Sequence, residues 1–324
     1  MTKLLTVTDL TVRFPIKKKQ GLFGKKSYLT AVDHINFEVK KGETLAIVGE
    51  SGSGKTTAAL AIARLISGEA HGTAYLDDRD LLSMDEPSLK DMRKRIQVIF
   101  QDPYSSLNPR QRAMEIVQEP LDNLTDKTKS EKQDIVDTLF TAVGLRPEQK
   151  GLFPHQFSGG QRQRIGIARA LSTQPDIIIC DEPVSALDVA VQAQILNLLR
   201  NLQKKRDLTY LFISHDLGVV QHMCDSIVVM YMGKIVEYAD RLSFFKNPQH
   251  PYSQALLSAV PSVTATKQKS KRIMIKGDSP DPLNLPVGCR FATRCPLAEE
   301  RCKTVEPKLL PVTDQVSVAC HLRH

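Results

Sequence analysis

The sequence predicts an α/β fold around a mostly parallel sheet, and three observations carry this prediction. Apolar runs of strand length alternate with stretches of helical periodicity between residues 43 and 232. A glycine-rich octapeptide, residues 49–56, lies between one such run and a helical stretch. Another apolar run, residues 176–180, ends in two adjacent carboxylates. Strands that alternate with helices of about 10–15 residues are typical of helix-covered parallel sheets.

The composition is that of a globular chain with enough apolar material for a core. It has 324 residues, of which 41% are hydrophobic and 25% charged, and this excludes disordered, collagen-like and disulfide-scaffold classes. The formal charge of +8 favours anionic partners such as nucleotides, lipid head groups or nucleic acid. No apolar run approaches the ~18 residues needed to cross a bilayer, and residues 1–10 lack the apolar core of a signal peptide. We therefore expect a cytoplasmic chain that does not span a membrane.

The elements follow in order. Residues 4–14 and 31–39 alternate apolar and polar side chains around a basic insert at 15–28, which predicts an antiparallel unit. A strand at 43–48 leads into the glycine loop, and a helix at 57–65 follows it. Further strands are predicted at 95–100, 176–180, 209–214 and 226–232, and further helices at 132–143, 165–171, 189–204 and 217–224. Enrichment in Thr, Lys and Ser predicts a linker near 261–279.

Residues 49–56 match G-x-x-x-x-G-K-[ST] in the required context of a strand followed by a helix. In such a loop, glycines let backbone N–H groups surround a phosphate, and the helix N-terminus adds partial positive charge. Lys55 is predicted to reach the terminal phosphates, and Thr56 to offer its hydroxyl to Mg²⁺. The predicted nucleotide-binding residues here are Gly49, Glu50, Ser51, Gly52, Ser53, Gly54, Lys55, Thr56 and Thr57. The motif alone leaves kinases, GTPases, ATPases and motor proteins open.

Asp181 and Glu182 stand at the carboxyl end of the apolar run 176–180. Ligands of open α/β sheets bind at the carboxyl ends of strands. We expect Asp181 to hold Mg²⁺ through its water shell and Glu182 to polarise the water that attacks the γ-phosphate. A solvated strand end or a helix cap is the structural alternative, and the glycine loop makes it the weaker one.

Residues 157–164, Phe-Ser-Gly-Gly-Gln-Arg-Gln-Arg, resemble the signature of ATP-binding cassette (ABC) ATPases, with Phe157 where Leu is more usual. This resemblance implies a P-loop NTPase (RecA-like) core with an N-terminal antiparallel β subdomain, a helical signature subdomain at about 103–171 and a short C-terminal extension. It also implies that Ser158, Gly159, Gly160 and Gln161 serve the ATP bound to the opposite subunit of a dimer.

Other family elements occur in the expected order. Gln101 resembles the Gln-loop residue that senses Mg²⁺ and the attacking water, and residues 185–188, which end in Asp188, resemble the D-loop at the dimer interface. His215 resembles the switch histidine that contacts the γ-phosphate. Phe14 matches the aromatic position that stacks on adenine, with a role in the core as its competitor. Taken singly, such a glutamine or histidine is more often structural, and the joint order favours the functional assignment.

Residues 101–109, 154–157 and 248–252 resemble stretches of the ATPase subunits of oligopeptide and dipeptide importers, whose relatives also carry nickel or oligosaccharides. An ABC ATPase domain is then expected at 1–260, and a linker with a cysteine-containing extension at 261–324. The resemblance implies two integral-membrane permease subunits, a second and usually non-identical ATPase subunit, and an extracytoplasmic substrate-binding protein. It places the chain peripherally on the cytoplasmic face of the inner (cell) membrane.

A soluble ABC ATPase that acts on nucleic acid is the alternative from another class, and the positive charge superficially supports it. Chromosome-associated relatives insert a long coiled coil between glycine loop and signature, whereas about 100 residues without sustained heptads intervene here. Translation-factor relatives carry two cassettes, and this chain has one glycine loop of this type. We therefore expect no nucleic-acid partner.

Four of the six cysteines, Cys289, Cys295, Cys302 and Cys320, fall within the last 36 residues. Their spacing fits neither common zinc ribbons nor bacterial ferredoxins. A [4Fe–4S] cluster, as in some members of the resembled group, a Zn²⁺ site with His321 as a further candidate ligand, and unligated thiols all stay open. Cys180 and Cys224 are predicted to be buried small hydrophobes. Lysines 17, 18, 19, 25 and 26 predict a solvated loop, with a lipid-contacting patch as the alternative.

Overall fold

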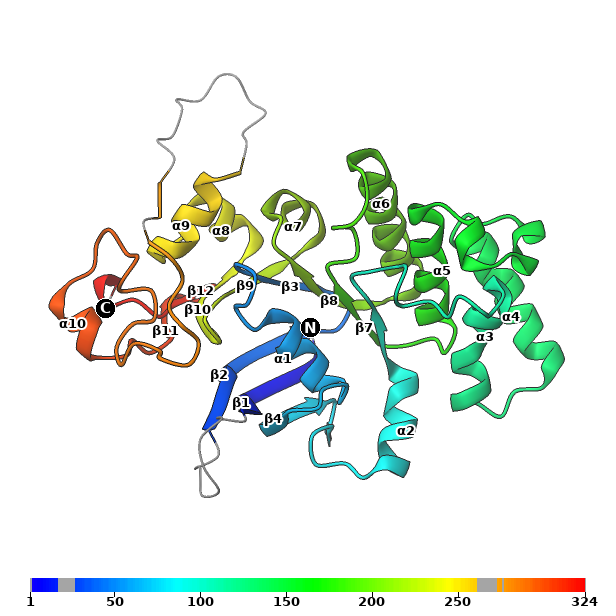
Figure 1. Cartoon of the computed structure of the whole chain (residues 1–324), viewed down its shortest axis with the longest axis horizontal. Coiled ribbons are helices and arrows are strands. Elements are labelled where there is room, and N and C mark those ends of the chain that lie inside the picture. The colour runs from blue at the N-terminus through cyan, green and yellow to red at the C-terminus, as the bar shows by residue number, and fades with distance from the viewer. Residues whose placement is uncertain (1, 17–26, 261–272, 276, 324) are drawn as a thin grey trace. The chain divides into compact units, whose positions relative to one another are not determined.

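A computed structural model describes residues 2–16, 27–260, 273–275 and 277–323 (Figure 1). The chain divides into two units, and each is described by itself. The first comprises residues 1–2, Val39–Thr44 and Ser83–Ile213, and the second comprises Lys3–Glu38, Leu45–Leu82 and Ser214–His324. The lysines of the basic insert and most of the expected linker lie outside the described residues, so those interpretations stay predictions.

The first unit contains parallel strands in the order β8-β7-β6, namely β8 (Thr209–Ser214), β7 (Ile177–Asp181) and β6 (Ile96–Ile99). Its helices are α2 (Glu86–Arg95), α3 (Ala113–Leu124), α4 (Lys129–Ala142), α5 (Gly159–Leu171) and α6 (Val189–Arg206), with short 3₁₀ turns at Pro147–Gly151 and Pro154–Gln156. Figure 1 shows α3, α4 and α5 grouped together. They bury apolar side chains such as Ile116, Phe140 and Ile165, in the region expected to be helical.

The second unit contains two sheets. One has the order β2-β1-β4-β5, with β1 (Lys3–Ile16), β2 (Ser27–Lys40), β4 (Glu69–Leu76) and β5 (Arg79–Asp80). β4 pairs antiparallel with both β1 and β5, and helix α1 (Lys55–Ile62) packs against β1. The antiparallel N-terminal subdomain is therefore present, and the sequence interpretation had missed β4 as a member.

The other sheet runs in the order β11-β12-β10-β9-β3 within this unit. Its strands are β3 (Thr44–Val48), β9 (Ser226–Tyr231), β10 (Lys234–Asp240), β11 (Leu310–Thr313) and β12 (Val316–Val318). β3 is parallel to β9, and the pairs β9–β10, β10–β12 and β12–β11 are antiparallel. The remaining helices are α7 (Leu217–Met223), α8 (Arg241–Lys246), α9 (Pro251–Ser258) and α10 (Glu300–Thr304), with a 3₁₀ turn at His321–Arg323.

The C-terminal extension builds directly onto this sheet. β12 pairs with β10 along the edge that β9 leaves open, as Figure 1 shows at the red end of the chain. Phe291 of the extension packs edge-on against Tyr231, with ring centroids 5.3 Å apart, and lies 5.3 Å from the ring of Tyr252. All three rings are buried. Among the described residues, no helix is both long and apolar enough to cross a membrane.

Candidate active site

The glycine loop follows the fully buried strand β3, and its last two residues, Lys55 and Thr56, begin α1. A Cβ added to Gly49 would lie 2.2 Å from the carbonyl oxygen of Met230, and one added to Gly54 would lie 2.4 Å from that of Ala31. Gly54 has φ +100°, a conformation that side chains with a Cβ rarely adopt. These two glycines are required because the loop passes against the backbone of β9 and β2.

The loop forms a cradle with the properties that a phosphate needs. The Lys55 Nζ is buried and donates to the carbonyl oxygens of Gly49 and Glu50, each at 2.9 Å. The Ser53 Oγ is buried and has no hydrogen-bond partner among the described residues, so a bound oxyanion would satisfy it. Thr56 and Thr57 lie in the first turn of α1, whose N–H groups have no intrahelical acceptor. The residues therefore fit a nucleotide phosphate.

In the first unit, the predicted carboxylate pair stands at the end of β7. Asp181 is buried, and Glu182 has φ +44°. The Glu182 N–H donates to the Ile213 carbonyl at 3.0 Å. The Gln101 Nε2 donates to the Glu182 Oε2, also at 3.0 Å. The structure thus brings Gln101 and Glu182 together, as the predicted roles of both require.

The signature residues begin helix α5. The Ser158 Oγ accepts the Gln161 N–H at 3.3 Å, and the Gln161 Oε1 accepts the Ser158 N–H at 3.0 Å, which completes a capping box. A Cβ on Gly160 would lie 2.5 Å from the Cγ1 of Val191 in α6, and one on Gly159 would lie 3.3 Å from Leu187. Small residues are thus required where the signature meets the D-loop, whose Asp188 caps α6 through the Val191 N–H at 3.0 Å.

Phe157, the departure from the family signature, is buried with 3% exposure. The substitution of Phe for the more usual Leu therefore replaces one buried apolar side chain by another and leaves Ser158, Gly159 and Gly160 of the signature as they are.

Two predicted contacts with nucleotide lie in the second unit. His215 follows β8 and is exposed, and Asp216 behind it caps α7 by accepting the N–H groups of Gly218 and Val219. Phe14, at the end of β1, is half-buried, and its ring fills the space beside Gly68. Both roles stay predictions.

Residues that sequence reasoning missed surround Glu50. Its N–H donates to the buried Tyr252 hydroxyl at 2.8 Å, and its carboxylate accepts two bonds from Arg294, at 2.8 and 3.3 Å. Arg294 lies 244 positions along the chain from Glu50. The run 248–252 that contains Tyr252 was noticed only as a family resemblance, and no local signal pointed to Arg294.

The four C-terminal cysteines line one small cavity together with His250, Phe291 and His321. Burial and the neighbouring thiols raise the pKa of Cys289 to about 11, and burial raises the pKa values of Cys295 and Cys320. Within the part of the chain that the structure describes, no group of three or more His, Cys, Asp or Glu side chains is arranged to hold a metal ion. A resident metal or cluster is therefore not shown. Cys180 and Cys224 are buried, as predicted.

The sequence matches two families of known proteins. Residues 32–185 match the family described as ABC transporter, and residues 236–302 match the C-terminal region of oligopeptide/dipeptide transporters. The chain is 48% identical to the oligopeptide transport ATP-binding protein AppF of Bacillus subtilis, over 98% of this chain and 97% of that one. It is 44% identical to the dipeptide transport ATP-binding protein DppF of Escherichia coli, over 98% and 93%.

This chain belongs to the ABC transporter family of ATP-binding proteins. Its fold agrees with that of a solved ATP-binding cassette, MJ0796, a dimer in a post-hydrolysis state bound to ADP and Pi. The TM-score is 0.64 at 28% identity, and the match covers 73% of this chain and 98% of that one. The CbiO1 cassette of Clostridium perfringens matches with a TM-score of 0.64 at 26% identity, over 76% and 92%. The predicted P-loop NTPase core and ATPase activity are confirmed.

Proposed function

We propose that this ABC ATPase energises the import of dipeptides or oligopeptides. The similarity to subunits named for oligopeptide and dipeptide transport, over nearly the full length of both chains, carries the proposal. The match extends into the C-terminal region characteristic of that group. Energy for transport would come from ATP held between two cassettes, and motion of the cassettes would act on a separate membrane pore.

In the proposed reaction, Glu182 polarises the water that attacks the γ-phosphate. The hydrogen bond from Gln101 supports this role because it fixes the orientation of the carboxylate. Thr56, Asp181 and Gln101 would hold Mg²⁺, which neutralises charge on the phosphates when it is bound. His215 would contact the γ-phosphate and Phe14 the adenine.

The signature would act in a second subunit. Ser158, Gly159, Gly160 and Gln161 form a helix start suited to an anion, and Asp188 caps the neighbouring helix α6. We propose that these residues close on the nucleotide of a partner ATPase that is related but not identical. Two permease subunits and an extracytoplasmic binding protein complete the proposed importer, with this chain on the cytoplasmic face of the cell membrane.

Reconstitution tests the proposal. The chain would be co-expressed with its candidate permeases and second ATPase, and the purified complex placed in liposomes with the binding protein. We expect uptake of a radiolabelled tripeptide that requires ATP and is lost when Glu182→Gln replaces the wild-type subunit. Uptake of nickel or an oligosaccharide without uptake of peptide would overturn the peptide assignment. ATP hydrolysis stimulated by nucleic acid, without any association with permeases, would overturn the transport role.

We further propose that Cys289, Cys295, Cys302 and Cys320 hold a [4Fe–4S] cluster. Their convergence on one cavity supports this. A single Zn²⁺ would need all its sulfurs about 2.3 Å from one point, whereas a four-iron cluster gives each thiolate its own iron.

The cluster is tested by chemical analysis. Anaerobically purified protein is expected to contain about four irons per chain and to absorb broadly near ~400 nm. Cys302→Ser should lower the iron content, while Cys224→Ser, at a buried cysteine outside the cavity, should not. Stoichiometric zinc, or protein without metal, would contradict the proposal.

A further inference from the structure

The C-terminal extension reaches into the nucleotide-binding loop through one side chain. Arg294 forms a two-pronged ion pair with Glu50, and its Nη1 also donates to the hydroxyls of Tyr231 and Ser279, each at 3.2 Å. The Ser279 hydroxyl donates in turn to the Glu50 Oε2 at 3.2 Å. A bidentate pair of this type fixes direction as well as distance.

Glu50 is held at three points. Its N–H donates to the Tyr252 hydroxyl, its carbonyl oxygen accepts from Lys55, and its carboxylate is held by Arg294. Tyr252 belongs to α9 and Lys55 to α1. The conformation of the loop around Lys55 therefore depends on residues far along the chain, one of which lies in the extension.

The charge on Arg294 is well supported. Burial alone would lower the pKa of its guanidinium, but hydrogen bonds to Glu50 and Tyr231 raise that pKa above the usual arginine value. Its side chain is 10% exposed, whereas that of Glu50 is 31% exposed. Because Glu50 stands in a loop that binds a polyphosphate, an unpaired carboxylate here would repel the ligand and compete for the Lys55 ammonium.

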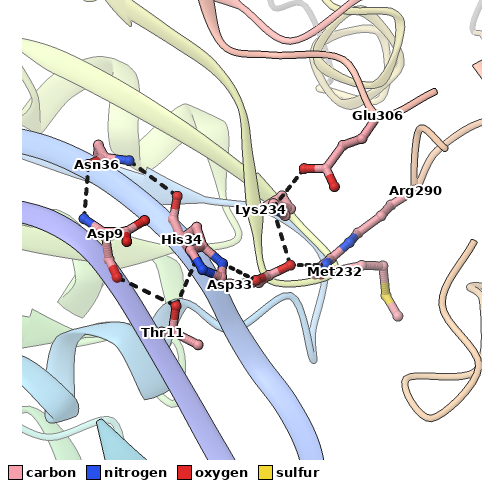
Figure 2. A network of polar contacts seen from close by, with 9 residues as sticks. All are labelled: Asp9, Thr11, Asp33, His34, Asn36, Met232, Lys234, Arg290 and Glu306. Carbon is pink, nitrogen blue, oxygen red and sulfur yellow. Dashed lines mark hydrogen bonds and ion pairs between the residues drawn. The ribbon is translucent and has the colours of Figure 1, made fainter. Parts of the chain in front are cut away.

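The segment that carries Arg294 is fixed at its other end by Arg290. Arg290 pairs with Asp33 of β2 and donates to the Met232 carbonyl, and Lys234 bridges Asp33 and Glu306 (Figure 2). Burial alone would raise the pKa of Asp33, but its bond to His34 and these two cations lower it. Asp33 is thus an anion that anchors the extension. Because Arg290 is held in this way, the nearby Arg294 extends from a fixed segment of backbone.

We propose that Arg294 is a positioning residue of the ATPase, through which the C-terminal extension sets the affinity for ATP. It orients Glu50 and neutralises its charge, and so holds the loop ready for the phosphates. This role depends on the ATPase activity of the chain and is independent of the transported substrate and of any cluster.

A double-mutant cycle on the purified full-length chain tests the proposal. Arg294→Ala is expected to raise the Kd of Mg-ATP about tenfold, a coupling usual for charged residues in contact, to raise KM similarly and to leave kcat within about twofold. Arg294→Lys keeps the charge but loses the second prong, and it should recover part of the affinity. In a Glu50→Gln background, the further change Arg294→Ala should alter Kd less than about twofold.

Arg323→Ala is the matched control, because Arg323 also lies in the extension but donates to the Gln249 carbonyl and not to a residue of the loop. It should leave the Kd of Mg-ATP unchanged. The proposal is wrong if Arg294→Ala weakens ATP binding equally in the wild-type and the Glu50→Gln backgrounds, because the effect would then be a general disturbance of the extension. It is also wrong if Arg294→Ala and Arg294→Lys both bind ATP as the wild type does.

Discussion

Replacement of Gly54 by alanine tests whether close backbone packing, as opposed to flexibility, explains the glycine of the nucleotide loop. The new Cβ would lie 2.4 Å from the Ala31 carbonyl oxygen, whereas real Cβ atoms essentially never come within 3.0 Å of such an atom. The loop or strand β2 must therefore yield by about 0.6 Å or more. The added Cβ is fixed to the backbone of residue 54, and the Ala31 oxygen is itself a backbone atom, so no flexible side chain can move aside. The backbone that precedes Lys55 or that of β2 must therefore shift.

The magnitude follows from two contributions. The positive φ of Gly54 costs about 1–2 kcal/mol for a residue with a Cβ, and the displacement moves Lys55 relative to the phosphate site. A misplacement on the order of 1 Å can cost about 10²-fold in rate. We therefore expect kcat/KM for ATP to fall by about two orders of magnitude, and the free energy of unfolding to fall by more than the strain of about 1–2 kcal/mol alone, because the forced displacement adds to it.

Steady-state ATP hydrolysis and chemical denaturation measure the two quantities. Gly52→Ala is the comparison for stability, because Gly52 has φ +78° but no heavy atom within 4 Å of an added Cβ. Gly52→Ala should therefore incur only the cost of the positive φ, without a steric clash, and so be less destabilised than Gly54→Ala. Wild-type kinetics for Gly54→Ala, or equal destabilisation of the two variants, would show that the close approach to Ala31 is not the reason for the glycine.

Three further predictions concern other parts of the molecule. Glu182→Gln should keep the Kd of ATP and the melting temperature near those of the wild type while lowering kcat by about 10²–10⁴-fold, the usual contribution of a general base; normal turnover would refute its assigned role. Asp33→Asn should lower stability by about 1–3 kcal/mol at pH 7. Because its folded pKa is depressed, the stabilisation by Asp33 is present above the ordinary pKa of 3.8 and lost as pH falls below it, so melting temperatures of the two proteins should converge as the pH falls below 3.8. Gly166→Ala, inside α5 with open space around an added Cβ, should stabilise by about 0.5–1 kcal/mol, and destabilisation in a denaturant titration would contradict this.

The sequence predicted the elements whose signal is local. Strands β3, β7, β8 and β9 were found within one or two residues because they are short, apolar and flanked by turns. β4 was missed because its sequence, Glu-Ala-His-Gly-Thr-Ala-Tyr-Leu, has a polar first half and gains its order from pairing with β1. Helix α3 lies in the helical subdomain expected at about 103–171 but was not delimited, since Pro120 stands inside it and proline normally argues against a helix interior.

The same distinction separates the predicted from the unpredicted parts of the site. The loop 49–56 and the run that ends in Glu182 could be predicted from the sequence, because residues adjacent in sequence act together there. Arg294 could not be predicted, because its partner Glu50 is close to it only in the folded chain, where β12 pairs with β10 and Phe291 packs on Tyr231. Helix propensity and spacing carry no information about such pairings.

The extension therefore also shares part of the apolar core with the ATPase domain. Phe291 and Val316 share one buried cluster with Tyr231, Tyr252 and Val229, which lie before residue 260. A chain cut after residue 260 would expose this cluster and remove the partner of Glu50 in the same step. Loss of ATP binding by such a fragment would thus not identify the cause, whereas Arg294→Ala leaves Phe291 and the β10–β12 pairing intact. The single substitution is the one that separates the support of the fold from the support of the nucleotide loop.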